Sequence, residues 1–169
     1  MSSDCALSSP PSGTNGTLDR GTLTGSYGSS IASRADASRG QQTVSTAGDV
    51  NGDGFADLIV GMPYATTTNG IESGAAYVIF GKAAGFTSNI DVSTLGPSTG
   101  FSITGAGAHD WAGYSVSAAG DVNGDGYGAL LVGPPPALGT HTSGVRYLIF
   151  GQAPGLGHNV DLPNRSPTD

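Results

Sequence analysis

Two short segments of the chain space their side-chain oxygen atoms in a pattern that could bind a metal ion. In the first, AGDVNGDGFADLIVG (residues 47–61), carboxylate and amide side chains occupy positions 1, 3, 5 and 9 of a tight loop: Asp49, Asn51, Asp53 and Asp57. Gly52 and Gly54 let the backbone fold inward without steric cost. Calcium takes about six to eight oxygen ligands in flexible geometry, and the Phe55 carbonyl with a water would bring the set to that number. The pattern predicts a calcium site.

Other metals and motifs fit this loop less well. Three carboxylates within nine residues would repel one another without a cation. No Cys or His lies among them, so zinc and copper are poor candidates. An EF-hand opens with a similar D-x-N-x-D-G pattern but requires Glu at position 12, where this chain has Val60. An Asx-rich turn without a metal is the remaining alternative.

A close copy of the loop, AGDVNGDGYGALLVG, occupies residues 119–133. Ala129 stands where the first loop has its last carboxylate. The ligand set that remains is Asp121, Asn123, Asp125 and the Tyr127 carbonyl. Because one ligand is lost, we expect weaker calcium binding here, or a water in the gap.

The loops belong to a repeat of about 72 residues that predicts an all-β fold. Asp49 and Asp121 are 72 positions apart, and the motifs YVIFG (residues 77–81) and YLIFG (residues 147–151) are 70 apart. The strands expected in the first unit are residues 43–46, 58–60, 75–80 and 101–105. Four antiparallel strands per repeat are typical of a β-propeller blade. Abundant glycine (29 residues) and proline (10 residues) disfavour helix.

The ordered combination of acidic loop, GMP or GPP turn and IFG strand resembles the FG-GAP repeat of integrin alpha-subunit propellers and bacterial surface proteins. The resemblance covers roughly residues 25–160. It implies that each repeat is a propeller blade and that the acidic loop binds calcium between its first two strands. We expect an N-terminal arm at 1–24, a first repeat at 25–100 and a second repeat at 101–169.

Two repeats are too few to close a propeller, which typically has about four to eight blades. The chain could be a fragment of a longer protein, several copies could assemble, or two blades could pack face to face as a small sandwich. The second unit reads as lacking its outer strand, while GTLTG (residues 21–25) or SSIAS (residues 29–33) precedes the first unit. This pattern suggests that an N-terminal strand is donated to the second unit, in the same chain or in a neighbouring one.

Charge and composition limit the partners. The net charge of −7 makes nucleic acid an improbable partner, and no apolar segment is long enough to span a membrane. Cys5 is the single cysteine and has no internal disulfide partner. Asn15 and Asn164 begin triplets that read as N-glycosylation acceptors.

The function that these features indicate is an extracellular, calcium-stabilised structural or adhesive module. It would self-assemble into a ring or filament or bind other cell-surface proteins or glycans. The alternative is a carbohydrate-binding module, or an accessory module of a secreted enzyme. Trp111 would stack on a sugar in the carbohydrate-binding module, whereas otherwise it fills the core or anchors a turn. The GPSTG segment (residues 96–100) matches a nucleophile pattern but lies in a Gly/Pro loop, so we expect no enzyme activity.

Overall fold

The computed structural model describes residues 28–33, 41–87, 89–134, 145–153 and 159–163. These residues form short β-strands and one 3-10 turn at Val92–Thr94, so the predicted all-β class is confirmed. In this part of the chain no helix has the length and apolarity needed to cross a bilayer. The sheets stay open, as expected for an incomplete propeller.

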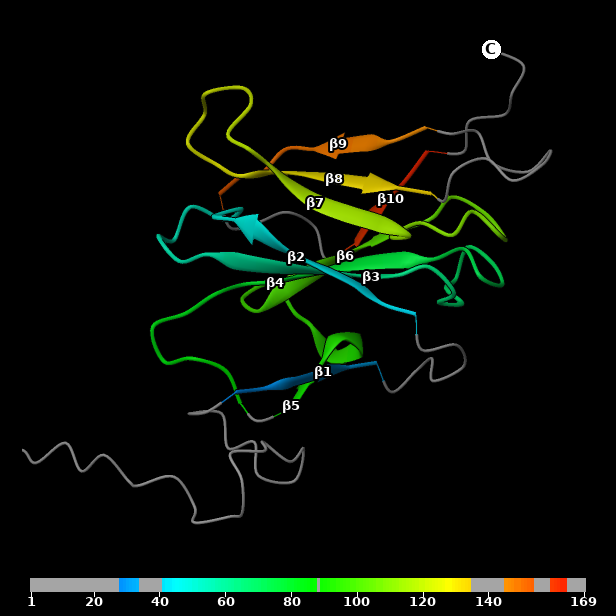
Figure 1. Ribbon diagram of the computed structural model, residues 1–169, viewed down its shortest axis with the longest axis horizontal. Coiled ribbons are helices and arrows are strands. Elements are labelled where there is room, and N and C mark those ends of the chain that lie inside the picture. The colour runs from blue at the N-terminus through cyan, green and yellow to red at the C-terminus, as the bar shows by residue number, and fades with distance from the viewer. Residues whose placement is uncertain (1–27, 34–40, 88, 135–144, 154–158, 164–169) are drawn as a thin grey trace, which may run out of the picture.

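The first blade is the central, five-stranded sheet of the structure (Figure 1). Its four antiparallel strands are β2 (Thr43–Gly48), β3 (Asp57–Met62), β4 (Ala75–Ile79) and β6 (Gly100–Thr104). All four strands expected from the sequence are therefore present and pair in that order. A fifth strand, β10 (Asn159–Asp161), comes from the second unit and pairs with β6 in parallel.

The second blade is a three-stranded sheet in the described part of the chain. It consists of β7 (Ser115–Gly120), β8 (Ala129–Gly133) and β9 (Tyr147–Ile149), and β9 is an edge strand. A β-bulge between residues 118 and 120 repeats the one between residues 46 and 48 of the first blade. The two acidic loops thus leave their first strands through the same irregularity.

A third, two-stranded sheet pairs β1 (Ser30–Ala32) with β5 (Asn89–Asp91) in parallel. The SSIAS segment considered for strand donation therefore lies against its own chain, whereas residues 21–25 fall outside the described residues. The proposed division at residues 24 and 100 stays a prediction.

The three sheets lie in layers, with the first blade in the middle (Figure 1). One apolar core lies on each face of the first blade. Ile59 and Val78 of the first blade face Leu130 and Val132 of the second blade. On the other face, residues that include Val60 and Ile79 are covered in part by Ile31 of β1 and Ile90 of β5. Because both faces of β3 are covered, its burial is nearly continuous rather than alternating.

The two blades approach each other closely where β3 passes the turn before β7. A Cβ atom added to Gly61 would lie 2.0 Å from the Gly113 carbonyl oxygen and 2.4 Å from Thr43 Oγ1. The Thr43 hydroxyl donates a hydrogen bond to the same carbonyl at 2.9 Å. The contact therefore leaves no room for any side chain at position 61.

We expect Gly61→Ala to lower the free energy of unfolding by about 2 kcal/mol, because the added methyl group must push two backbones apart. Chemical denaturation measures the change. Gly96→Ala is the matched control, since a Cβ there meets no atom within 4 Å. Equal stability of the two variants would contradict the close approach.

Besides their backbone pairing, β6 and β10 are joined by side-chain hydrogen bonds at Asp161. Its carboxylate accepts hydrogen bonds from Thr104 Oγ1 at 2.5 Å and from Asn69 Nδ2 at 3.1 Å. These bonds, the Thr104 bond foremost, lower the pKa of Asp161 below its ordinary value of 3.8. A depressed pKa in the folded state means that the ionised carboxylate stabilises the fold above pH 3.8 and that this contribution is lost as the pH falls through the folded-state pKa.

Asp161→Ala should therefore destabilise the protein at neutral pH. The difference in stability between this variant and the unaltered chain should shrink below pH 3.8. Thermal unfolding across a pH series measures this. In Thr104→Val, which removes one donor at nearly constant shape, the Asp161 carboxyl should titrate at higher pH by NMR. A stability difference between the two proteins that does not vary with pH would show that the ionised Asp161 carboxylate does not stabilise the fold.

Candidate metal centre in the acidic loops

The carboxylate of Asp49 organises the first loop. Its Oδ1 accepts hydrogen bonds from the amides of Gly52 at 2.7 Å and Asp53 at 3.1 Å, and its Oδ2 accepts one from the amide of Gly54 at 2.8 Å. Gly52 and Gly54 have φ values of +74° and +86°, which glycine adopts without strain. The loop therefore wraps around a single carboxylate.

Asn51 and Asp53 continue the same pattern. Asn51 Nδ2 donates to Asp53 Oδ2 at 2.9 Å, and Asn51 Oδ1 accepts from the Asp53 amide at 3.1 Å. Asp53 Oδ1 accepts from the Phe55 amide at 2.9 Å. The loop is thus an Asx-rich turn in which polar side chains take the place of an apolar core.

Asp57 has a role that the sequence did not reveal. It begins β3 with a fully buried carboxylate, which accepts hydrogen bonds from the amides of Val50 and Gly81, both at 2.8 Å. Burial raises the pKa of Asp57, the two amide bonds oppose that rise, and repulsion from Asp53 and Asp49 adds to it. Asp57 therefore ties the loop to the end of β4. The only signal in the sequence was a glycine directly after the third strand.

The second loop folds in the same way without that carboxylate. Asp121 accepts hydrogen bonds from the amides of Gly124, Asp125 and Gly126 at 2.8, 3.1 and 2.9 Å. Asn123 Nδ2 donates to Asp125 Oδ2 at 2.8 Å, and the Tyr127 amide donates to Asp125 Oδ1 at 2.9 Å. Ala129 is buried at the position equivalent to Asp57. The turn therefore depends on its first carboxylate rather than its last.

The second loop also covers the first. The Gly128 amide donates to the Asp49 carbonyl at 2.6 Å, and the Gln152 amide donates to the Val50 carbonyl at 3.0 Å. The Tyr127 ring lies over Gly52, where an added Cβ would be 2.5 Å from Tyr127 Cε1. As a result Asn51 is buried, whereas the equivalent Asn123 is exposed.

The donor chemistry of the first loop suits a hard cation. In the described residues, no three His, Cys, Asp or Glu side chains gather as a metal-binding group, so a site here would also need the Asn51 amide oxygen and the Phe55 carbonyl. Repulsion from Asp53 and Asp49 nevertheless reaches Asp57. The loop therefore carries three carboxylates and one amide close together along the chain. They do not converge as a metal-binding group in the described residues, but oxygen atoms alone are the donor set that calcium takes.

Trp111 lies in a turn apart from the loops. Its Nε1 donates to Glu72 Oε2 at 3.2 Å, and its ring makes edge contacts with Tyr64 and His109, each at 6.4 Å between ring centroids. These contacts anchor the turn, and a sugar-binding role for Trp111 stays a prediction. Cys5, Asn15 and Asn164 lie outside the described residues.

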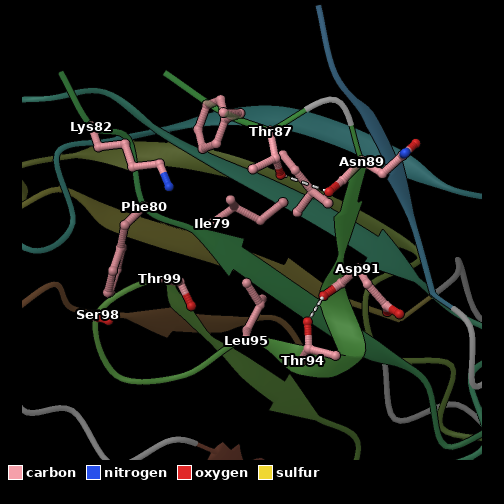
Figure 2. Close-up of a pocket in the computed structure, with 12 residues that line it drawn as sticks. Ile79, Phe80, Lys82, Thr87, Asn89, Asp91, Thr94, Leu95, Ser98 and Thr99 are labelled. Atoms are coloured by element: carbon pink, nitrogen blue, oxygen red, sulfur yellow. Dashed lines mark hydrogen bonds between the residues drawn. The ribbon is translucent and has the colours of Figure 1, made fainter. Parts of the chain in front are cut away.

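A shallow hollow lies between the end of β4 and the segment around β5 (Figure 2). Thr87 Oγ1 donates to the Asn89 carbonyl at 2.9 Å, and Thr94 Oγ1 donates to the Asp91 carbonyl at 2.8 Å. Lys82 points toward the hollow, with its Nζ 5.9 Å from the centre of the Phe86 ring. The threonine hydroxyls thus serve local turns, and nothing here converges as it would in a ligand site.

We expect Asp57→Asn to lower the free energy of unfolding by about 1–3 kcal/mol in calcium-free buffer, because an amide can accept only one of the two buried N–H bonds. Chemical denaturation with a chelator present measures the loss. The control is Asp53→Asn, which changes an exposed side chain of the same loop and should cost less. A larger loss for the control would show that Asp57 does not brace the loop.

Comparison with known proteins agrees with this architecture. Residues 42–79 match the FG-GAP repeat family. The chain is 32% identical to integrin alpha-PS5 of Drosophila melanogaster over 123 residues, which is 70% of this chain and 11% of that protein. It is 33% identical to integrin alpha pat-2 of Caenorhabditis elegans over 116 residues, 64% of this chain and 9% of that protein. The chain thus spans about a tenth of the length of the curated relatives it matches.

The match to the family covers β2, the acidic loop, β3 and β4, and so includes the loop and the start of β3, which carry the predicted ligands of the first calcium site. The resemblance inferred from loop, turn and strand is confirmed: the chain is an FG-GAP repeat protein similar to integrin alpha chains.

Proposed function

We propose that this chain is an extracellular, calcium-stabilised module that acts through protein–protein contacts, in adhesion or in self-assembly. The observation that carries the proposal is the first acidic loop, where Asp49 and Asp53 lie near enough to Asp57 for their repulsion to raise its pKa. The similarity to integrin alpha chains supports an extracellular setting and a non-enzymatic role.

Calcium would be held by side-chain oxygens of Asp49, Asn51, Asp53 and Asp57 and by the Phe55 carbonyl. The ion would neutralise the acidic groups and so remove the repulsion that raises the pKa of Asp57. Because Asp57 also holds the amides of Val50 and Gly81, a bound ion would stiffen the joint between the loop and the blade. Extracellular modules of this kind bind calcium at roughly 0.1–1 mM.

The second loop would bind calcium more weakly, through Asp121, Asn123, Asp125 and the Tyr127 carbonyl. Ala129 supplies no ligand, and the whole loop is exposed to water from residue 121 to residue 126. Each unit would therefore have a different calcium affinity despite the shared turn.

Isothermal titration calorimetry tests the calcium proposal. We expect one stronger and one weaker site in the unaltered chain, loss of the stronger site in Asp49→Ala, and a strengthened second site in Ala129→Asp, which restores the missing ligand. Thermal stability should rise with calcium concentration, as for any ligand that binds only the folded state.

The control is Asp91→Asn, which removes a carboxylate outside both loops and should leave both sites unchanged. Unchanged calcium binding in Asp49→Ala, or no binding by the unaltered chain at millimolar calcium, would refute the proposal.

A further inference from the structure

The internal repeat allows the surroundings of each side chain to be compared with those of its equivalent one unit away. Three residues on the face that the first blade turns toward the second are almost fully buried: Val50, Val78 and Phe80, at 1, 0 and 9% exposed. Their equivalents on the second blade are largely exposed: Val122, Leu148 and Phe150, at 52, 41 and 48%. We call these last three residues the C-side face. Each of these residues is apolar. In the first unit, the equivalent position is buried by the blade that follows.

The opposite side of the molecule shows the converse. Val116 of β7 packs against the core between the blades, whereas its equivalent Val44 of β2 is 70% exposed. Tyr127 lies over Gly52 of the preceding blade, whereas its equivalent Phe55 is 42% exposed. We call Val44 and Phe55 the N-side face. Together the two faces account for all the exposed large apolar residues of the described chain except Ile71.

We infer that the partner of this module is a second copy of the same chain, with the C-side face of one copy docked on the N-side face of the next. This deepens the proposed function, on which it rests, by naming the partner. The contact between copies repeats the contact between the two blades within the chain. Phe55 of one copy would lie over Gly124 of the other, which has no atom within 4 Å of an added Cβ, whereas Gly52 is covered by Tyr127.

The backbone can repeat its part of the contact as well. Within the chain, the Gly128 and Gln152 amides donate to the Asp49 and Val50 carbonyls of the preceding loop. The equivalent donors on the N-side face are the Ala56 and Lys82 amides. The equivalent acceptors on the C-side face are the Asp121 and Val122 carbonyls. The two loops that carry the acceptors share the same bulge and the same three glycines with positive φ, at residues 48, 52 and 54 and at residues 120, 124 and 126.

Strand β1 completes the match. It pairs with β5 in the same parallel register that joins β6 to β10, and Gly28 before it has a φ of +154°, close to the +151° of Gly100 in β6. In the first blade, β6 also pairs with β4 on its other edge. By that equivalence β9 of one copy would pair with β1 of the next, placing Tyr147 opposite Ser30. The five-stranded sheet would then recur as β7, β8 and β9 with β1 and β5 of the neighbour.

The two faces differ, so the contact is head-to-tail and each copy adds two blades. Such contacts give a ring if the rotation closes and a filament if it does not. A ring of typically four to eight blades would hold roughly two to four copies.

Complementation of two blocked variants tests the inference on the full chain. Val44→Glu blocks the N-side face and Leu148→Glu blocks the C-side face. With calcium in excess, light scattering should give assemblies for the unaltered chain and monomers for each variant alone. An equimolar mixture of the two variants should give a dimer that grows no further, because one intact face of each kind remains.

Ile71→Glu is the matched control, since Ile71 is exposed but belongs to neither face, and it should assemble like the unaltered chain. Circular dichroism verifies that every variant is folded. In a Cys5→Ser background, Ser30→Cys in one copy should form a disulfide with Tyr147→Cys in another, because paired strands bring Cα atoms to about 5 Å. Leu148→Cys, on the opposite face of β9, should not.

A monomeric unaltered chain, a mixture that stays monomeric, or equal disruption by Ile71→Glu would overturn the inference. Calorimetry on Val44→Glu separates this result from the calcium proposal. If calcium binds while the mixture fails to pair, only the second-copy contact is wrong. If the mixture pairs and no calcium binds, the calcium proposal fails and the contact stands.

Discussion

The structure depends on carboxylates that accept hydrogen bonds from backbone amides. The first acidic loop takes its shape from three hydrogen bonds that backbone amides donate to the Asp49 carboxylate. The Asp57 carboxylate accepts two more hydrogen bonds, from the amides of Val50 and Gly81. Ionised acceptors make stronger hydrogen bonds than neutral ones, so a loop rich in glycine can be held in one conformation. The cost is a concentration of negative charge, which a cation would relieve.

Much of the architecture could be predicted because the chain carries its pattern twice. The strands β2, β3, β4 and β6 lie within one or two residues of their predicted positions, since β-branched runs and glycine ends marked them. The order of the four strands followed from the repeat. The loops too were located correctly, because a D-x-N-x-D-G segment can form few structures other than a tight turn.

Other features depend on contacts between segments that are distant in the sequence. The amides bound by Asp57 include that of Gly81, which is 24 positions away and carries no side chain to reveal its role. The parallel strands β5 and β10 are three residues long, too short for a periodic signal. The sequence left open whether Trp111 anchors a turn or binds a sugar, and its indole donates to Glu72, a pairing that no local pattern indicates.

The parallel pairing of β10 with β6 has a consequence for how the molecule unfolds. A strand from the far end of the described chain forms the edge of the first sheet, and Leu162 just after it enters the core between the blades. The first sheet therefore cannot lose this edge without also loosening the second unit. Modules built from stacked repeats often unfold in steps from their ends, but here β10, which comes from the second unit, is paired with the first sheet. The two units should consequently behave as one cooperative block rather than as two independently melting repeats.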